Sequence, residues 1–199
     1  MSSSTALEEM HHIAPHIRVG RARAGVLMLI LSDSLSVVAL MAAGGYLNAL
    51  NTENQFKIAG DHAPALLPGI LVAIAWLLSG LTYYWWARGA QKNAGKGQTI
   101  IFVVALVLMI AGLVGQIWIG ATLGYAAPFH AYVSLVLFVT WYSVVHLALA
   151  VIIGLLLLGR ILRGRLSEEH SYIIGVTGYW WYYTVISALI MWLFASFFV

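Results

Sequence analysis

The sequence predicts an all-α polytopic membrane protein, a bundle of five transmembrane helices with its N-terminus in the cytoplasm and its C-terminus outside. Three observations predict this fold class: an apolar composition, five long apolar runs and an uneven distribution of basic residues among the loops. Of the 199 residues, 62% are hydrophobic and only 9% are charged, whereas a soluble domain carries about 25% charged residues. Because so few charges cannot cover a soluble globule, lipid is the expected solvent.

Five runs are long enough to cross the hydrocarbon layer, which is about 30 Å thick and needs roughly 20 apolar residues. They cover residues 24–47, 65–87, 99–123, 129–159 and 172–199. The fourth and fifth runs exceed the minimum, so we expect them to tilt or to project beyond the bilayer. The runs are continuous rather than alternating, which argues against a β-barrel. The chain therefore divides into a polar tail, residues 1–23, and a transmembrane domain, residues 24–199.

The basic residues predict the orientation. All but one of the ten Lys and Arg residues lie before the first run, after the second or after the fourth, and the exception is Lys57. Because cytoplasmic loops carry an excess of Lys and Arg, this pattern places the N-terminus in the cytoplasm. It does not resemble a nucleic-acid-binding footprint. The tail has no apolar core and is not a cleavable signal peptide, so the first run is expected to be the insertion signal.

Asp33 is the only Asp, Glu, Lys or Arg residue well inside a run. An unpaired carboxylate at that depth costs at least about 2.5–3.5 kcal/mol, so we expect it to face protein or water, or to be protonated. Ser36, Ala43 and Gly44 are predicted to share its face. Two interpretations stay open: a proton-relay or ion site, and a carboxyl group that hydrogen-bonds a neighbouring helix. The lack of a second acid at this depth favours the latter.

Two further polar residues lie inside the runs. Gln116 belongs to a series with four-residue spacing whose other members are Gly112, Gly120 and Gly124. Small residues at this spacing predict a seam where another helix approaches closely. His146 lies in the middle of the fourth run, where we expect a hydrogen bond to a neighbouring helix. Neither residue is part of a recognisable catalytic motif, and no catalytic residue is predicted.

Aromatic residues form two short strings. Residues 83–86 end the second run and residues 179–183 lie in the last run. Strings of this kind are typical of the belts that anchor a helix at the membrane interface. For the second string, packing inside the bundle and a contact with lipid or quinone are the alternatives, and a belt or packing role is the default expectation.

The histidines and cysteines do not predict a metal site. There are no cysteines, which excludes disulfides, Fe–S clusters and zinc–thiolate sites. His130 and His146 are about 24 Å apart along a helix axis and cannot bind one metal. His62 and His130 could meet near the outer surface, but two histidines are a weak metal signal. Three further histidines are in the tail and are expected to be solvated: His11, His12 and His16.

Several polar motifs occur in the order found in one known family. Ser32-Asp33 lies in the first run, Gln116 in the third, His146 in the fourth and Tyr179-Trp180 in the last. From about Gly25 onward, this order resembles subunit III of the haem–copper terminal oxidases in its five-helix form. Quinol-oxidising members of that family have Ser-Asp in the first helix, as here, and the last pair is similar to the start of the family's final motif, Tyr-Trp-His-Phe-x-Asp.

The sequence also departs from that family at four positions. The family's Glu three residues after the glutamine is Ile119 here, and the first histidine of its His-Gly-x-His motif is Ser143. The His and Asp of the final motif are Trp181 and Thr184. The resemblance therefore concerns span order, loop charge and a few polar positions, and the chain resembles a divergent member.

The resemblance implies a non-catalytic subunit of a respiratory oxidase in a bacterial or archaeal cytoplasmic membrane. Such a chain binds no redox cofactor itself, because haem and copper belong to the catalytic subunit I on which it packs. It also holds phospholipids in a cleft and supports proton uptake and stability of the complex. Asp33 would be the family's intramembrane carboxylate, and Gln116 and His146 would be polar positions at the lipid cleft or the subunit interface.

Three alternatives stay open. The chain could be a membrane anchor that binds haem b or quinone, for which His62 and His130 are the only plausible histidine pair. It could be a small transporter with Asp33 as its coupling site, although no repeated half is present. It could also accompany a nitric oxide reductase instead of an oxygen reductase. The sequence does not separate cytochrome c from quinol as the electron donor.

Overall fold

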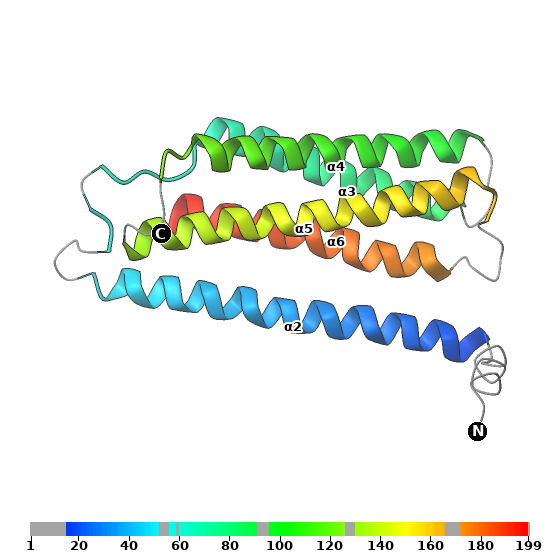
Figure 1. Ribbon diagram of the computed structural model, residues 1–199, viewed down its shortest axis with the longest axis horizontal. Helices are drawn as coiled ribbons and strands as arrows, with labels where there is room; N and C mark the ends of the chain where they lie inside the picture. The colour runs from blue at the N-terminus through cyan, green and yellow to red at the C-terminus, as the bar shows by residue number, and fades with distance from the viewer. Residues whose placement is uncertain are drawn as a thin grey trace, which may run out of the picture.

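The computed structural model describes residues 15–51, 56–58, 60–90, 96–125, 130–165 and 172–198. Five long α-helices occupy the predicted runs, and the last continues into a short π-helix (Figure 1). Their bounds are α2 (Pro15–Ala49), α3 (Leu66–Ala90), α4 (Lys96–Thr122), α5 (Ala131–Leu162), α6 (Tyr172–Leu193) and η2 (Phe194–Phe198). All five α-helices are long and apolar enough to cross a membrane. The prediction of an all-α, five-helix membrane protein is therefore confirmed.

The first helix is longer than the apolar run that predicts it. α2 has 35 residues, which corresponds to a length of about 52 Å, well beyond the hydrocarbon thickness of about 30 Å. It begins at Pro15, a residue that fits the first turn of a helix because its missing N–H would have no partner there. The arginines at its start are good helix formers. Part of the predicted polar tail is consequently helical, and His16 lies exposed in the first turn. His11 and His12 lie outside the described residues.

Four of the helices form a closed unit, and the fifth lies beside it. α3, α4, α5 and α6 pack in a ring in which each helix touches two others, whereas α2 packs mainly on α6 and to a smaller extent on α5 (Figure 1). Only 6% of the most apolar stretch of α2 is buried within the chain, compared with 33% to 50% for the other helices. The core therefore belongs to α3–α6, and most of the surface of α2 is left for lipid or for another protein.

Aromatic side chains fill the core at one end of this ring. Tyr83 stacks on Trp181 with ring centroids 4.9 Å apart and donates a 2.8 Å hydrogen bond to the Ile174 carbonyl. The ring of Trp86 lies 4.5 Å from the ring of Phe102. These interactions join α3, α4 and α6, so the aromatic string on α3 is a structural element of the bundle.

The predicted aromatic belts are therefore only partly correct. Tyr83 and Trp86 are fully buried, while Tyr84 and Trp85 between them are exposed. The reason is helical periodicity, because residues three apart share a face and the two between them point elsewhere. The string on α6 divides in the same way, with Trp180 and Trp181 buried and Tyr179 exposed.

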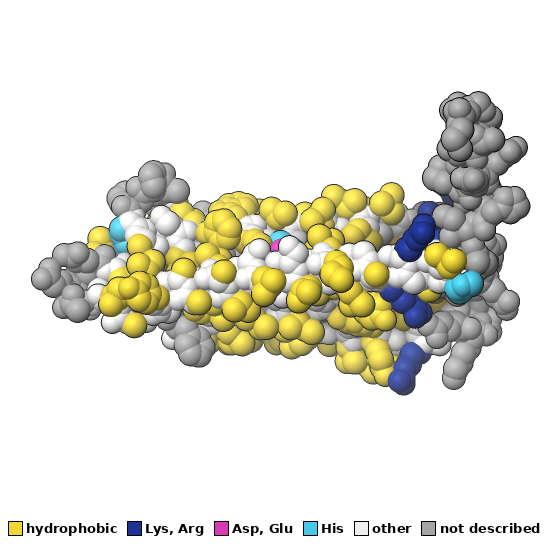
Figure 2. All heavy atoms as spheres, turned by 90° about the horizontal axis from the view of Figure 1, so that it is seen from below, with side chains coloured by type: hydrophobic (Ala, Val, Ile, Leu, Met, Phe, Trp, Pro, Cys, Tyr) yellow, Lys and Arg dark blue, Asp and Glu magenta, His cyan; other side chains and the backbone are white. Residues whose placement is uncertain are grey.

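The described basic residues other than Lys57 gather at one end of the molecule. Figure 2 shows Lys and Arg side chains grouped at that end, while apolar side chains cover the length of the bundle. They come from the start of α2, the end of α3, the start of α4 and the end of α5. At the end of α5, Gly164 has φ 63°, and the N–H groups of Gly164 and Arg165 donate to the carbonyls of Ile161 and Arg160. This is a Schellman motif, which ends the helix and directs the chain away from it.

Candidate functional site

The intramembrane carboxylate of Asp33 is held by three side chains from two other helices. The hydroxyl of Tyr142 donates to Asp33 Oδ1 at 2.5 Å, and the hydroxyl of Tyr183 donates to Oδ2 at 2.6 Å. His146 Nε2 lies 2.9 Å from Oδ2. Asp33 lies near the middle of α2, as predicted, and its partners lie near the middle of α5 and α6. The four residues together form a polar cluster that we call the Asp33 cluster.

The second ring nitrogen of His146 determines how protons are distributed in the cluster. His146 Nδ1 lies 2.8 Å from the Tyr142 carbonyl, and because a carbonyl only accepts, Nδ1 carries a proton. Both tyrosine hydroxyls already donate to Asp33. The interaction between Nε2 and Oδ2 therefore contains one proton, which belongs either to His146 or to Asp33. Its transfer between them leaves the net charge of the cluster unchanged, which is the arrangement that a low-dielectric environment tolerates best.

Aromatic rings surround the histidine. The Tyr142 ring lies 4.1 Å from the His146 ring, and the Trp180 ring stacks on the same imidazole at 5.8 Å. The Asp33 side chain keeps 18% of its surface exposed and His146 keeps 10%. In Figure 2 an acidic side chain and a histidine reach the surface between apolar side chains near the middle of the molecule. The site is thus lined by aromatic rings but still reaches the outer surface of the bundle.

The inner face of α2 differs from the face that the sequence predicts. Val37 and Gly44 are buried and Asp33 is half-buried, whereas Ser36 and Ala43 are exposed. The Ser36 hydroxyl donates to the Ser32 carbonyl of its own helix. The inner face therefore continues from Asp33 to Val37, four positions on, and not to Ser36, three positions on. A Cβ atom added at Gly44 would lie 2.5 Å from a side-chain carbon of α5, so glycine at this position allows the close approach of α2 to α5.

Gln116 lies elsewhere in the bundle. Its Nε2 donates to the Thr140 carbonyl on α5 at 3.5 Å. The predicted glycine seam also divides: a Cβ atom at Gly112 would lie 2.4 Å from Trp76 on α3, and one at Gly120 would lie 3.2 Å from Thr140. Gly124 follows the end of the helix with φ 68°. Gln116 therefore occupies a packing contact between α4 and α5.

Two of the three predicted site residues come together in the structure. Asp33 and His146 are direct partners, although the sequence gives no reason to pair them. Gln116 bonds α5 outside the Asp33 cluster. The predicted hydrogen bond between His146 and a neighbouring helix is thus present, and its partner is Asp33 on α2.

The outer histidines have separate partners. His130 Nε2 pairs with Asp61 at 3.1 Å, and the His62 backbone N–H donates to the Tyr125 hydroxyl at 2.6 Å. Among the described residues, no group of three or more His, Cys, Asp or Glu side chains is close enough to hold a metal ion. The two pairs connect the segment before α3 with the ends of α4 and α5.

Tyr142 and Tyr183 are the site residues that the sequence alone does not reveal. One signal is present, because Tyr142 precedes His146 by one helical turn and both face the same neighbour. Tyr183 belongs to the aromatic string of the last run, for which belt and packing roles are predicted, so the sequence does not indicate that its hydroxyl group binds a carboxylate.

No family model matches this sequence, and no curated protein is significantly similar to it.

Proposed function

We propose that this chain is a non-catalytic subunit of a respiratory haem–copper oxidase complex, equivalent to subunit III. In such a complex the partner subunit holds haem and copper, reduces oxygen to water and translocates protons. The observation that carries the proposal is the Asp33 cluster. A mid-membrane carboxylate on the first span, held by the last two spans, agrees with the resemblance in span order and polar positions.

The packing of α2 supports a partner protein. An apolar helix surface is normal in lipid, but α2 is joined to its own chain through the Asp33 cluster, a contact near Gly44 and a few apolar side chains, and only 6% of its most apolar stretch is buried. Its remaining surface is available to a catalytic subunit and to phospholipids. The proposed orientation places the basic end in the cytoplasm, with the N-terminus inside and the C-terminus outside, in a bacterial or archaeal cytoplasmic membrane.

A small transporter is the second candidate function. The observation that favours it is the pairing of Asp33 with His146, because chains of carboxylates and histidines carry protons in pumps and transporters. Proton flux into liposomes that contain only this chain, abolished by Asp33→Asn, would support a transporter and contradict the accessory-subunit proposal. The haem or quinone anchor has weaker support, since His62 and His130 each have a different partner.

The test compares two carboxylates in the complex purified through a tag on this chain. Asp33→Asn removes the carboxylate that pairs with His146, and Asp61→Asn removes the one that pairs with His130 outside the hydrophobic middle. We expect Asp33→Asn to slow oxygen reduction or to speed inactivation during turnover, with unchanged haem content. Asp61→Asn is expected to behave like the unmodified complex. Haem loss in Asp33→Asn, or the same behaviour in both variants, would contradict the proposal.

A further inference from the structure

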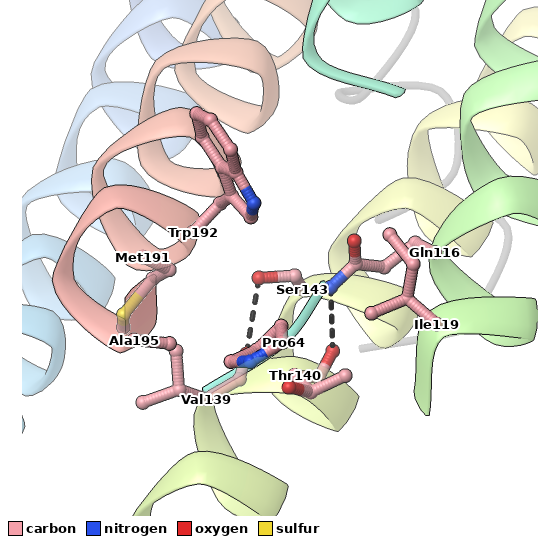
Figure 3. A pocket seen from close by; sticks show the side chains of 9 residues that line it. All are labelled: Pro64, Gln116, Ile119, Val139, Thr140, Ser143, Met191, Trp192 and Ala195. Carbon is pink, nitrogen blue, oxygen red and sulfur yellow. Dashed lines mark hydrogen bonds between the residues drawn. The ribbon is translucent and has the colours of Figure 1, made fainter. Parts of the chain in front are cut away.

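A small pocket lies between α4, α5 and α6, near the segment that leads into α3. The centre of a water molecule can occupy about 10 Å³ of this pocket, which is close to the minimum of about 10–15 Å³ that one buried water needs. The lining side chains are Pro64, Gln116, Ile119, Val139, Thr140, Ser143, Met191, Trp192 and Ala195 (Figure 3). Most of this wall is apolar, and four of its side chains carry polar atoms. One of them, the Thr140 hydroxyl, donates to the Val136 carbonyl of its own helix.

Two of these polar atoms have no hydrogen-bond partner among the described residues. They are Gln116 Oε1 and Trp192 Nε1, and both atoms are buried. Gln116 is 4% exposed, and its orientation is fixed because Nε2 must face the Thr140 carbonyl, which only accepts. A buried polar atom without a partner costs roughly 1–3 kcal/mol. An acceptor and a donor left together beside one pocket therefore indicate a ligand that satisfies both.

The third polar atom is the Ser143 hydroxyl. It donates to the Val139 carbonyl at 3.1 Å, so its lone pairs can accept a hydrogen bond. Figure 3 shows the Gln116 amide, the Ser143 hydroxyl and the Trp192 indole nitrogen around the same space. These three groups thus offer two acceptors and one donor.

We propose that this pocket is a binding site for an ordered water molecule. The water donates to Gln116 Oε1 and to Ser143 Oγ, and it accepts from Trp192 Nε1. Three hydrogen bonds are the usual number for a buried water. A metal cation does not fit, because the indole N–H only donates, and an apolar ligand would leave both Gln116 and Trp192 unsatisfied.

The site has a defined position relative to the Asp33 cluster. Ser143 precedes His146 by three residues on α5, which corresponds to about 4.5 Å along the helix axis. The water therefore lies within about one helical turn of the His146 position, on the side away from the basic end of the bundle. The inference itself depends only on the pocket and does not require the proposed function.

The test detects water at one indole N–H group in the full-length chain. The chain is labelled with ¹⁵N-tryptophan in phospholipid nanodiscs, and magnetisation transfer from water to each indole proton is recorded. Trp192 is assigned with Trp192→Phe. The matched control is Trp76, whose Nε1 is also buried and without a hydrogen-bond partner among the described residues but which does not line the pocket.

We expect a water cross-peak at Trp192, none at Trp76, and loss of the Trp192 cross-peak in Gln116→Leu. A Trp192 signal without a water cross-peak, or with a cross-peak to lipid protons, would overturn the proposal. If Trp192→Phe does not fold, a high-resolution map of the unmodified chain decides the question. Density for one water within hydrogen-bond distance of Gln116 and Ser143 supports the site, and an empty or lipid-filled pocket refutes it.

Discussion

Replacement of Asp33 by alanine is expected to weaken the attachment of α2 to the rest of the bundle. Asp33 is the common hydrogen-bond partner of Tyr142, Tyr183 and His146, and these hydrogen bonds join α2 to both α5 and α6. Alanine removes all three and leaves the partners without an acceptor in a mostly apolar environment. Little other packing compensates, because only 6% of the most apolar stretch of α2 is buried.

The magnitude follows from the three hydrogen bonds that the substitution removes. A hydrogen bond between membrane helices is worth about 0.6 kcal/mol on average and about 1.7 kcal/mol at most. Three such bonds predict a decrease of about 2–5 kcal/mol in the free energy of unfolding for Asp33→Ala. Asp33→Asn keeps one side-chain oxygen as an acceptor and is expected to lower this free energy by about half as much.

The assay measures the free energy of reversible unfolding of the full chain in bicelles by steric trapping. The control is Ser36→Ala on the same helix, since Ser36 is exposed and bonds only its own helix, and a destabilisation below about 0.5 kcal/mol is expected. Tyr183→Phe is expected to cost less in the Asp33→Ala background than in the unmodified chain, because both changes remove the same hydrogen bond. Equal destabilisation by Asp33→Ala and Ser36→Ala, or full additivity with Tyr183→Phe, would refute the role given to the cluster.

Three further changes test the packing of the bundle. Gly44→Leu is expected to destabilise the chain by about 1–3 kcal/mol through overpacking, because an added Cβ meets side chains of α5 and η2. The control is Gly45→Leu, since a Cβ at Gly45 meets nothing within 4 Å. Equal melting temperatures of the two variants would disprove the Gly44 contact. Gly112→Val is expected to lower the melting temperature because its Cβ would meet the Trp76 ring, whereas Gly159→Val meets nothing within 4 Å and is expected to be harmless. Ser79→Ala removes the hydroxyl that accepts from the Trp181 indole and donates to the Ala105 carbonyl, and we expect a destabilisation of about 1–3 kcal/mol. Unchanged unfolding in denaturant titrations would argue against a stabilising role of these two hydrogen bonds.

The sequence predicts the spans well because span length and composition are determined by the thickness of the bilayer. Asp33 is found in the same way, since a charged group at mid-membrane depth is costly wherever it points. The faces of the helices are harder to predict. In α5, Val136 and Val139 are buried while Val145 is exposed, and because lipid is as apolar as the core, the residue type carries no information about the side it faces.

The same physical reason explains why the partners of Asp33 were not predicted. Each of His146, Tyr142 and Tyr183 is compatible with several orientations, and the rotation of α5 and α6 about their axes is fixed only by packing across the whole ring. The buried half of the α3 aromatic string illustrates this as well, because its buried and exposed members differ only by their place in the helical repeat. Depth in the membrane can be estimated from the sequence, but the neighbouring helix at that depth requires the structure.

The measurement that tests the central claim most directly is purification of this chain from its native membranes in a mild detergent. A tag on the chain captures it, and the captured material is examined by a reduced-minus-oxidised spectrum and by mass identification of every partner. The proposal predicts a haem signal that accompanies a large, many-helix catalytic subunit present in a fixed ratio to this chain. A haem signal from this chain alone, or recovery of the chain with neither haem nor a partner, would contradict it.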